Sequence, residues 1–196
     1  MMRNYQHWAM LHATDIKATL TSHPEQRMAA SAAVFSRLRR EVWLVGDCQC
    51  LINGQLFDNP KPYEQQLAEA RAREARRLLD SGTIIDQLRA DDKARQTIIP
   101  AMIEAMKKQN IDYAVIDGFP IPQSKVKVIT LSFETFDVVL ATDGYPVLCP
   151  SLDESEAALK QQLNEDPLCI AQFKATKAWM EGNRSFDDRA YIRIKV

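Results

Sequence analysis

A series of short apolar segments joined by tight turns constrains the fold of this chain more than any other feature. Residues 31–35 and 41–45 are strand-like and are separated by the polar turn 37–40. Residues 48–52 form a third such segment, which ends at Asn53-Gly54, a dipeptide typical of a β-hairpin turn. Because turns this short cannot hold the helix that joins parallel strands, these residues predict an antiparallel meander.

Helices are predicted from composition and from capping signals. In chain order they are expected over residues 5–20, 63–79, 83–110, 151–163 and 166–182. Ser151 with Glu154 forms a capping-box pair, and Asp166-Pro167 offers an N-cap followed by a first-turn proline. An apolar stripe at helical spacing is expected to face the core, and it consists of Ile99, Met102, Ile103 and Met106. Pro100 is interpreted as a first-turn residue or a kink.

Further strands are predicted over residues 113–116, 126–131, 136–141 and 191–196. In the last of them polar and apolar residues alternate strictly, which places Ile192, Ile194 and Val196 on one face. The chain shows no internal repeat and no low-complexity linker, and 196 residues suffice for one well-filled core. We therefore expect a single domain over residues 1–196.

Composition argues against several classes of function. Lys plus Arg total 25 against 26 Asp plus Glu, and this net charge of -1 gives no electrostatic footprint for nucleic acid or for an anionic membrane. No run approaches the roughly 20 apolar residues of a membrane span, and the first residues resemble no secretory signal. The 4 cysteines form no CxxC pair and indicate free thiols. We therefore expect a cytoplasmic protein that binds neither nucleic acid nor membrane.

Three aspartates are candidates for a metal site. Asp143 follows the apolar strand 136–141 and precedes Gly144, so it lies at a strand tip where the backbone turns closely. Asp187 and Asp188 lie in a loop before the last strand. If these strands are neighbours, the three carboxylates converge at one sheet edge and suit a hard divalent ion, Mg²⁺ or Mn²⁺. Asp-Gly is also a common turn dipeptide, so a plain turn stays open as the alternative.

Three segments, taken in order, resemble the type 2C family of metal-dependent protein phosphatases. Residues 41–48, Glu-Val-Trp-Leu-Val-Gly-Asp-Cys, resemble that family's strand ending in Val-Gly-Asp-Ser. Residues 138–144, Val-Val-Leu-Ala-Thr-Asp-Gly, resemble its Leu-Leu-Ala-(Ser/Thr)-Asp-Gly segment. Residues 185–192, Ser-Phe-Asp-Asp-Arg-Ala-Tyr-Ile, resemble its closing Asp-(Asn/Asp)-x-Thr strand entry. The resemblance spans residues 28–196.

The resemblance implies an α+β fold, a four-layer αββα sandwich of two antiparallel sheets between helical layers. It also implies a binuclear Mg²⁺ or Mn²⁺ centre, whose activated water attacks a phosphoserine or phosphothreonine of a phosphorylated protein substrate. Carried over by position, Asp143 and Asp187 are expected as metal ligands, with Asp188 beside them. Asp47 is expected to help hold an additional, weaker metal or to anchor its loop.

The chain also departs from that family's pattern. Nothing in residues 1–30 matches the family's Glu-Asp and Asp-Gly-x-Gly-Gly segments or its phosphate-binding arginine, and Asp15 stands without the glycines. Cys48-Gln49 replaces the usual Ser-Arg, and Ala190 replaces the usual Thr. We therefore expect a truncated or degenerate phosphatase in which metal binding is weak or absent and the chain alone is inactive.

Two other interpretations remain open. The first is a non-enzymatic interaction or regulatory module that binds phosphorylated or other protein partners, which the missing Asp-Gly-x-Gly-Gly segment favours. The second is an αββα hydrolase with an N-terminal nucleophile, which would require cleavage between Asp47 and Cys48.

Overall fold

The computed structural model of the protein describes residues 14–135 and 137–196. The helices in this part of the chain are α2 (Thr14–Ser22), η1 (Pro24–Gln26), α3 (Glu64–Asp80), α4 (Ile85–Ala90), α5 (Lys93–Met106), η2 (Gln123–Lys125) and α6 (Leu152–Glu165). The strands are β1 (Ala32–Ser36), β2 (Glu41–Val45), β3 (Gln49–Ile52), β4 (Gln55–Asp58), β5 (Lys127–Thr130), β6 (Asp137–Ala141) and β7 (Tyr191–Lys195). The predicted mixture of helices and antiparallel strands is therefore confirmed.

Two sequence expectations concern the first predicted helix and a possible membrane span. Of the helix predicted over residues 5–20, residues 5–13 lie outside the described part of the chain, and residues 14–20 belong to α2. None of the described helices is long and apolar enough to cross a membrane.

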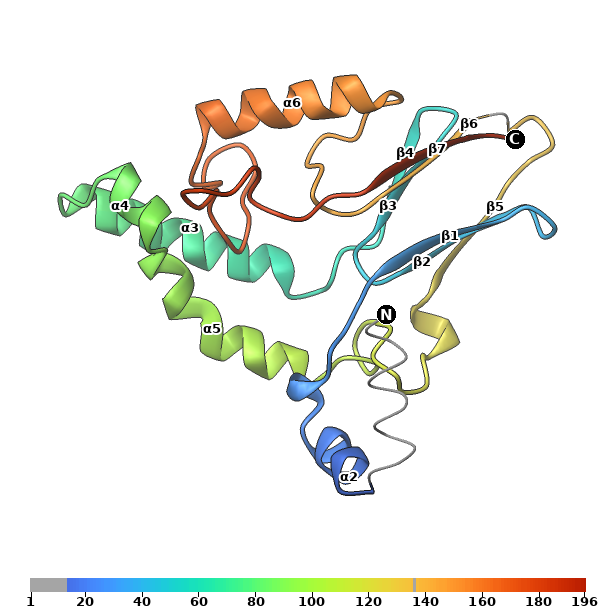
Figure 1. Cartoon of the computed structure of the whole chain (residues 1–196), viewed down its shortest axis with the longest axis horizontal. Coiled ribbons are helices and arrows are strands. Elements are labelled where there is room, and N and C mark those ends of the chain that lie inside the picture. The colour runs from blue at the N-terminus through green and yellow to red at the C-terminus, as the bar shows by residue number, and fades with distance from the viewer. Residues whose placement is uncertain (1–13, 136) are drawn as a thin grey trace.

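The strands form two antiparallel sheets (Figure 1). The smaller sheet has the order β1-β2-β5, and the larger has the order β4-β3-β6-β7. Within the larger sheet, Gln49 of β3 lies opposite Ala141 of β6, which in turn lies opposite Tyr191 of β7. The final strand is thus the direct neighbour of the strand that precedes Asp143, which is the arrangement that a shared carboxylate site requires.

One connection differs from the predicted meander. β1 pairs with β2, but β3 pairs with β4 and β6, so the chain passes from one sheet to the other between β2 and β3. Gly46 permits this change of direction because its φ is 76° and because a side chain there would overlap Ser31. The Asn53-Gly54 turn forms the expected hairpin, but its second strand, β4, had not been predicted.

The two sheets pack face to face over a common apolar layer. Its buried members are Val42, Leu44, Cys48, Cys50, Leu131, Val138 and Leu140. The inward residues of β2 and β6 alternate with outward ones, which is the period of two expected for strands. Cys48 and Cys50 lie in this layer, so the C-x-C pair packs in the core.

Helix α6 covers the other face of the larger sheet (Figure 1). The buried residues that form this contact are Leu51, Val139, Ala141, Leu159 and Leu163. The predicted capping box is present: the hydroxyl of Ser151 accepts the N–H of Glu154, and the Glu154 carboxylate accepts the N–H of Ser151. A local sequence signal therefore places this helix correctly.

Helices α3 and α5 pack together beyond one end of the sheets (Figure 1). Between α3 and the segment 166–180 lies Arg71, whose side chain is 1% exposed and whose Nη2 lies 2.8 Å from Oδ2 of Asp92. Asp92 also caps α5 by accepting the N–H of Arg95 at 2.9 Å, and it accepts the N–H of Ala178 at 3.0 Å. One buried ion pair thus joins α3, α5 and the segment 166–180.

The helix predicted over residues 166–182 is wrong. Arg71 Nη1 donates to the carbonyl oxygens of Leu168 and Ala175, at 2.9 and 3.1 Å. Cys169 has a φ of 51°, which no helical residue adopts. The side chain of Arg71 therefore takes carbonyls that an α-helix would use internally, and this long-range contact overrides the capping signal of Asp166-Pro167.

Helix α5 shows a second correction. Its buried residues are Ala94 and Ile98, whereas Ile99 and Ile103 of the predicted core stripe are 41% and 40% exposed. The helix faces the small residues of α3, which leaves Ile99 and Ile103 on the outside, whereas Met102 and Met106 of the stripe are half-buried. Pro100 lies inside α5, beyond its first turn.

The strand predicted over residues 113–116 is also absent. Asn110 has a φ of 57°, and its side-chain oxygen accepts the N–H of Val115 at 2.9 Å. Only isolated bridges involve this segment, from Ala30 to Ile116 and from Gln109 to Tyr113. A side chain therefore takes a hydrogen bond that a strand would need.

We predict that Arg71→Met lowers the free energy of unfolding by about 3–5 kcal/mol, because it leaves the Asp92 carboxylate buried without its cation. Urea denaturation followed by circular dichroism measures the change. Arg73→Met on the same helix, where the side chain is exposed, is the matched control and should change stability by less than about 0.5 kcal/mol. Equal stability of the two variants would contradict the central role of this pair.

Candidate metal centre

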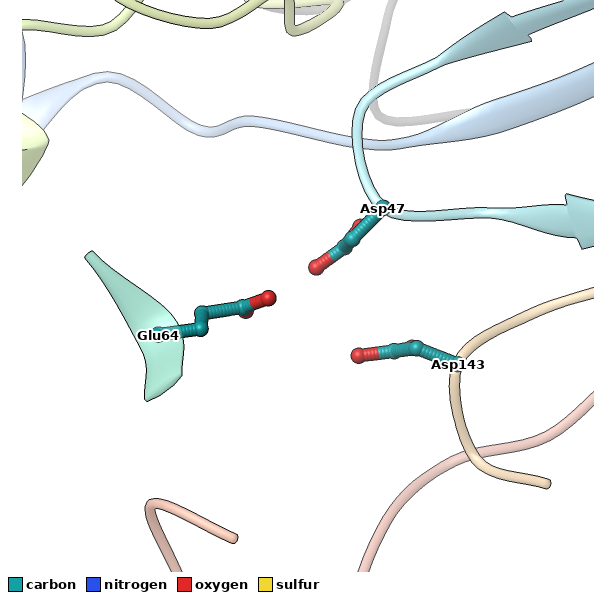
Figure 2. A group of neighbouring side chains, drawn as sticks. All are labelled: Asp47, Glu64 and Asp143. Atoms are coloured by element: carbon teal, nitrogen blue, oxygen red, sulfur yellow. The ribbon is translucent and has the colours of Figure 1, made fainter. Parts of the chain in front are cut away.

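Three carboxylates from separate elements converge at one end of the larger sheet. Asp47 lies in the turn before β3, Asp143 lies in the turn after β6, and Glu64 is the first residue of α3. One oxygen of each lies within 4.8 Å of the others, and Figure 2 shows the three side chains pointing toward a common centre. Within the described residues this is the single group of three or more potential ligands at such spacing.

The pairing of β3 with β6 brings Asp47 and Asp143 together. The two strands run antiparallel with Gln49 opposite Ala141, so the start of β3 and the end of β6 lie at the same edge of the sheet. Asp47 precedes the first of these paired residues by two positions, and Asp143 follows the second by two. The strand register therefore determines that both carboxylates lie at this edge.

Glu64 reaches the same place from the helical side. Asn59 Nδ2 donates to the carbonyl of Gly46 at 2.8 Å, which holds the connection between β4 and α3 against the turn of Asp47. The helix then begins at Glu64, where a carboxylate is favoured by the helix dipole. Glu64 had not been predicted as a site residue. The available signal was its place at the start of a helix, two residues after Pro62.

Gly144 brings the loop of Asp187 beside the turn of Asp143. A Cβ atom on Gly144 would overlap the backbone oxygen of Asp188, so a larger residue there would push the loop away. The N–H of Ala190 donates to the hydroxyl of Thr142 at 3.0 Å, and the N–H of Thr142 donates to the carbonyl of Ala190 at 3.2 Å. The loop is therefore fixed to the end of β6.

Two cavities meet at the loop of Asp187 and Asp188. The first, here called the carboxylate cavity, has a volume of about 260 Å³ and is bordered by Asp47, Glu64, Asp143 and Asp187. Asp188 lines a larger cavity of about 1020 Å³ instead. The two cavities share the residues Tyr145, Lys177, Phe186 and Asp187. Of the four candidates predicted from the sequence, three border the carboxylate cavity and Asp188 does not.

Lysine side chains already contact three of the four carboxylates that border this cavity. The Lys61 ammonium donates to Asp47, whose other oxygen accepts the hydroxyl of Ser31. The same ammonium lies 3.6 Å from Oε1 of Glu64. Lys177 donates to Asp187, and its side chain is 32% exposed. Each of these lysines supplies one positive charge beside the group of carboxylates.

The pKa values of the carboxyl groups show that the lysines neutralise the cluster only in part. Burial, followed by the charges of Asp47 and Asp187, raises the pKa of the Asp143 carboxyl from 3.8 to about 7. Burial also raises the pKa of Glu64, which Lys61 offsets only in part. At Asp47 burial acts in the same direction, but the charge and hydrogen bond of Lys61 outweigh it and lower the pKa. The cluster therefore favours a further positive charge.

Cys48, next to this site, has the wrong electrostatics for a nucleophile. Burial, followed by the negative charges of Asp47 and Asp143, raises the pKa of its thiol to about 12. The sulfur is therefore protonated at neutral pH in the folded chain, and the thiolate that would attack a substrate is scarce.

No protein-family model matches the chain, and no curated protein matches it. The resemblance to type 2C phosphatases therefore rests on the sequence motifs alone.

The raised pKa of Asp143 predicts a pH dependence. Because the folded chain holds this proton more tightly than the unfolded chain, the group's contribution to stability falls as pH rises from about 4 to about 7. In the presence of EDTA, Asp143→Asn should therefore have a higher Tm than the wild type at about pH 8, and the two should converge near pH 4.

The matched control is Asp86→Asn, an exposed substitution on α4. Its Tm relative to the wild type should be the same at both pH values. Calorimetry in matched buffers measures these differences, and an Asp143→Asn variant that is less stable than the wild type at about pH 8 would contradict the charge crowding.

Proposed function

We propose that this chain is a type 2C-like protein serine/threonine phosphatase domain with a site for Mg²⁺ or Mn²⁺. The observation that carries this proposal is the convergence of Asp47, Glu64 and Asp143 within 4.8 Å. They meet at the end of the larger sheet where the two family-like motifs that contain Asp47 and Asp143 lie side by side. The loop of the third motif is held beside them by Gly144.

The donor set fits a hard divalent cation. Carboxylate oxygens are the ligands that Mg²⁺ and Mn²⁺ prefer, and three of them lie close enough to share one ion. Burial, and after it the neighbouring carboxylates, raise the pKa of Asp143, and such an ion would neutralise the negative charge of these carboxylates. Asp187 borders the same cavity and offers a further oxygen. Since the described residues present one such group, the proposal is for a single weak ion site, without a complete binuclear centre.

The other residues of the cavity suit a phosphate group beside the ion. A bound divalent ion would supply a water molecule of lowered pKa as the nucleophile. Lys174 and Lys177 line the carboxylate cavity and offer positive charge to phosphate oxygens. Lys177 also lines the large cavity, which has room for the polypeptide around a phosphorylated residue. The substrate we propose is accordingly a phosphorylated protein.

The four-layer αββα sandwich belongs to the same proposal. Two face-to-face sheets and the α6 layer on the larger sheet support it. On the smaller sheet, Val34 and Val128 are 41% and 53% exposed, which suits a face that a further helical layer would cover.

A non-enzymatic phosphatase-like module is the second candidate. The favouring observation is Lys61, which neutralises part of the cluster from within the chain and allows it to stay folded without a metal. The N-terminal-nucleophile hydrolase is less well supported, because the raised pKa of Cys48 keeps its thiol protonated.

Mn²⁺ titration of the purified chain by calorimetry tests the metal site. We expect one weak site, and Asp143→Asn should lower its affinity at least about tenfold because it removes a charged ligand. Asp86→Asn, which is remote and exposed, should leave the affinity unchanged.

Hydrolysis of p-nitrophenyl phosphate with and without Mn²⁺ then separates the two candidates. Turnover that requires Mn²⁺ and is lost in Asp143→Asn supports the phosphatase, and it would overturn the inactivity of the chain alone that we expect from the sequence. Mn²⁺ binding with background turnover supports the non-enzymatic module. No detectable Mn²⁺ binding by the wild type contradicts the proposed metal site.

A further inference from the structure

Lys61 lies where a cation of the carboxylate cluster would be expected. Its ammonium donates to Asp47 and lies 3.6 Å from Glu64, which are two of the three residues whose oxygens converge. The side chain of Lys61 is only 19% exposed, and that of Asp47 is 8% exposed, so water screens their interaction poorly. The cluster thus contains a positive charge of its own.

We propose that Lys61 is an internal counter-cation that competes with a divalent ion for Asp47 and Glu64. This inference rests on the proposed function, since it concerns the same carboxylates. It adds that the affinity of the site for Mg²⁺ or Mn²⁺ is set by the exchange of one cation for another. A divalent ion that entered the same carboxylates without displacing an ammonium would bind more tightly.

The charges explain why the two cations exclude each other. Like charges a few ångströms apart repel strongly where water screens them poorly, and a divalent ion doubles that repulsion against an ammonium. A metal ion shared by Asp47 and Glu64 would lie about as close to the Lys61 ammonium as these carboxylates do now. Either the ion binds weakly or the ammonium withdraws.

The structure offers a place for the ammonium to go. Lys61 also lines a separate cavity of about 360 Å³ on the side of Asp112 and Tyr113. Asp112, whose side chain is 45% exposed, gives that cavity a carboxylate, paired with Lys108 at a distance of 3.8 Å. Lysine has a flexible four-carbon stem, so its ammonium can change cavities without movement of the backbone.

The backbone around Lys61 is held in place, so that only the side chain of this residue can rearrange. Pro60 and Pro62 flank the residue and restrict the backbone on either side. Asn59 anchors the same connection by its hydrogen bond to Gly46. The main chain at Lys61 is therefore held in place, and a rearrangement is confined to the side chain.

Mn²⁺ binding by the full chain tests the inference, with the free ion measured by electron paramagnetic resonance at constant ionic strength. Lys61→Met should bind Mn²⁺ at least about tenfold more tightly than the wild type, because the competing charge is gone. In EDTA the same variant should have a lower Tm than the wild type, because the carboxylates lose their counter-charge. Lys61→Arg, which keeps the charge, should not gain affinity.

A matched control separates competition from a general effect of net charge. Lys160→Met removes an exposed lysine of α6 and should leave Mn²⁺ affinity close to that of the wild type. Unchanged or weaker Mn²⁺ binding by Lys61→Met, while the wild type still binds and Asp143→Asn does not, would overturn the competition and leave the proposed function standing. No Mn²⁺ binding by either the wild type or Lys61→Met would overturn both.

Discussion

The buried pair of Arg71 and Asp92 is the interaction on which the arrangement of the helical side depends. A guanidinium without solvent contact needs an acceptor for each of its donors, and here these acceptors come from Asp92 and from the carbonyls of Leu168 and Ala175. Since the partners lie far apart in sequence, the pair fixes α3 and the start of α5 against the segment 166–180.

The same pair also positions two residues of the carboxylate cavity. Glu64 lies on the same helix as Arg71, and Lys177 lies next to Ala178, whose N–H donates to Asp92. The charged residues that border the carboxylate cavity from this side are therefore held by one ion pair.

The opposite side of the cavity depends on strand register. Asp47 and Asp143 meet because β3 and β6 are paired with Gln49 opposite Ala141. A slip of one residue would move the inward side chains of β6 to the outer face, so the apolar layer between the sheets protects the register and with it the site. The cluster thus combines a sheet edge, whose geometry is stabilised by apolar burial, with a helix start, whose position is set by the Arg71 pair. Neither part alone brings three carboxylates together.

The difference between contacts that follow local sequence patterns and contacts between distant elements explains what could be predicted from the sequence. β1, β2, β3, β5, β6, β7, α3 and the Ser151 capping box have local signals, and these were confirmed because the contacts that satisfy them lie within a few residues or follow the strand period. The helix expected after Asp166 fails because Arg71, far away in sequence, takes the carbonyls of that segment. The apolar stripe of α5 was assigned to the core because periodicity identifies a face but not the neighbour it meets. Glu64 was missed for the same reason: its role depends on where α3 begins relative to a turn that belongs to a different element.

The charge balance of the cluster gives a physical reason to regard it as more than a structural salt bridge. A structural pair matches charges one to one, as Arg71 and Asp92 do. Here Lys61 is shared by Asp47 and Glu64, while Asp143 has no hydrogen-bonded cation and its pKa is raised to about 7. Crowding carboxylates in this way costs folding free energy that a single apolar or amide residue at position 143 would avoid. An additional cation would remove that cost, and this is the physical reason for which we propose a cation site here.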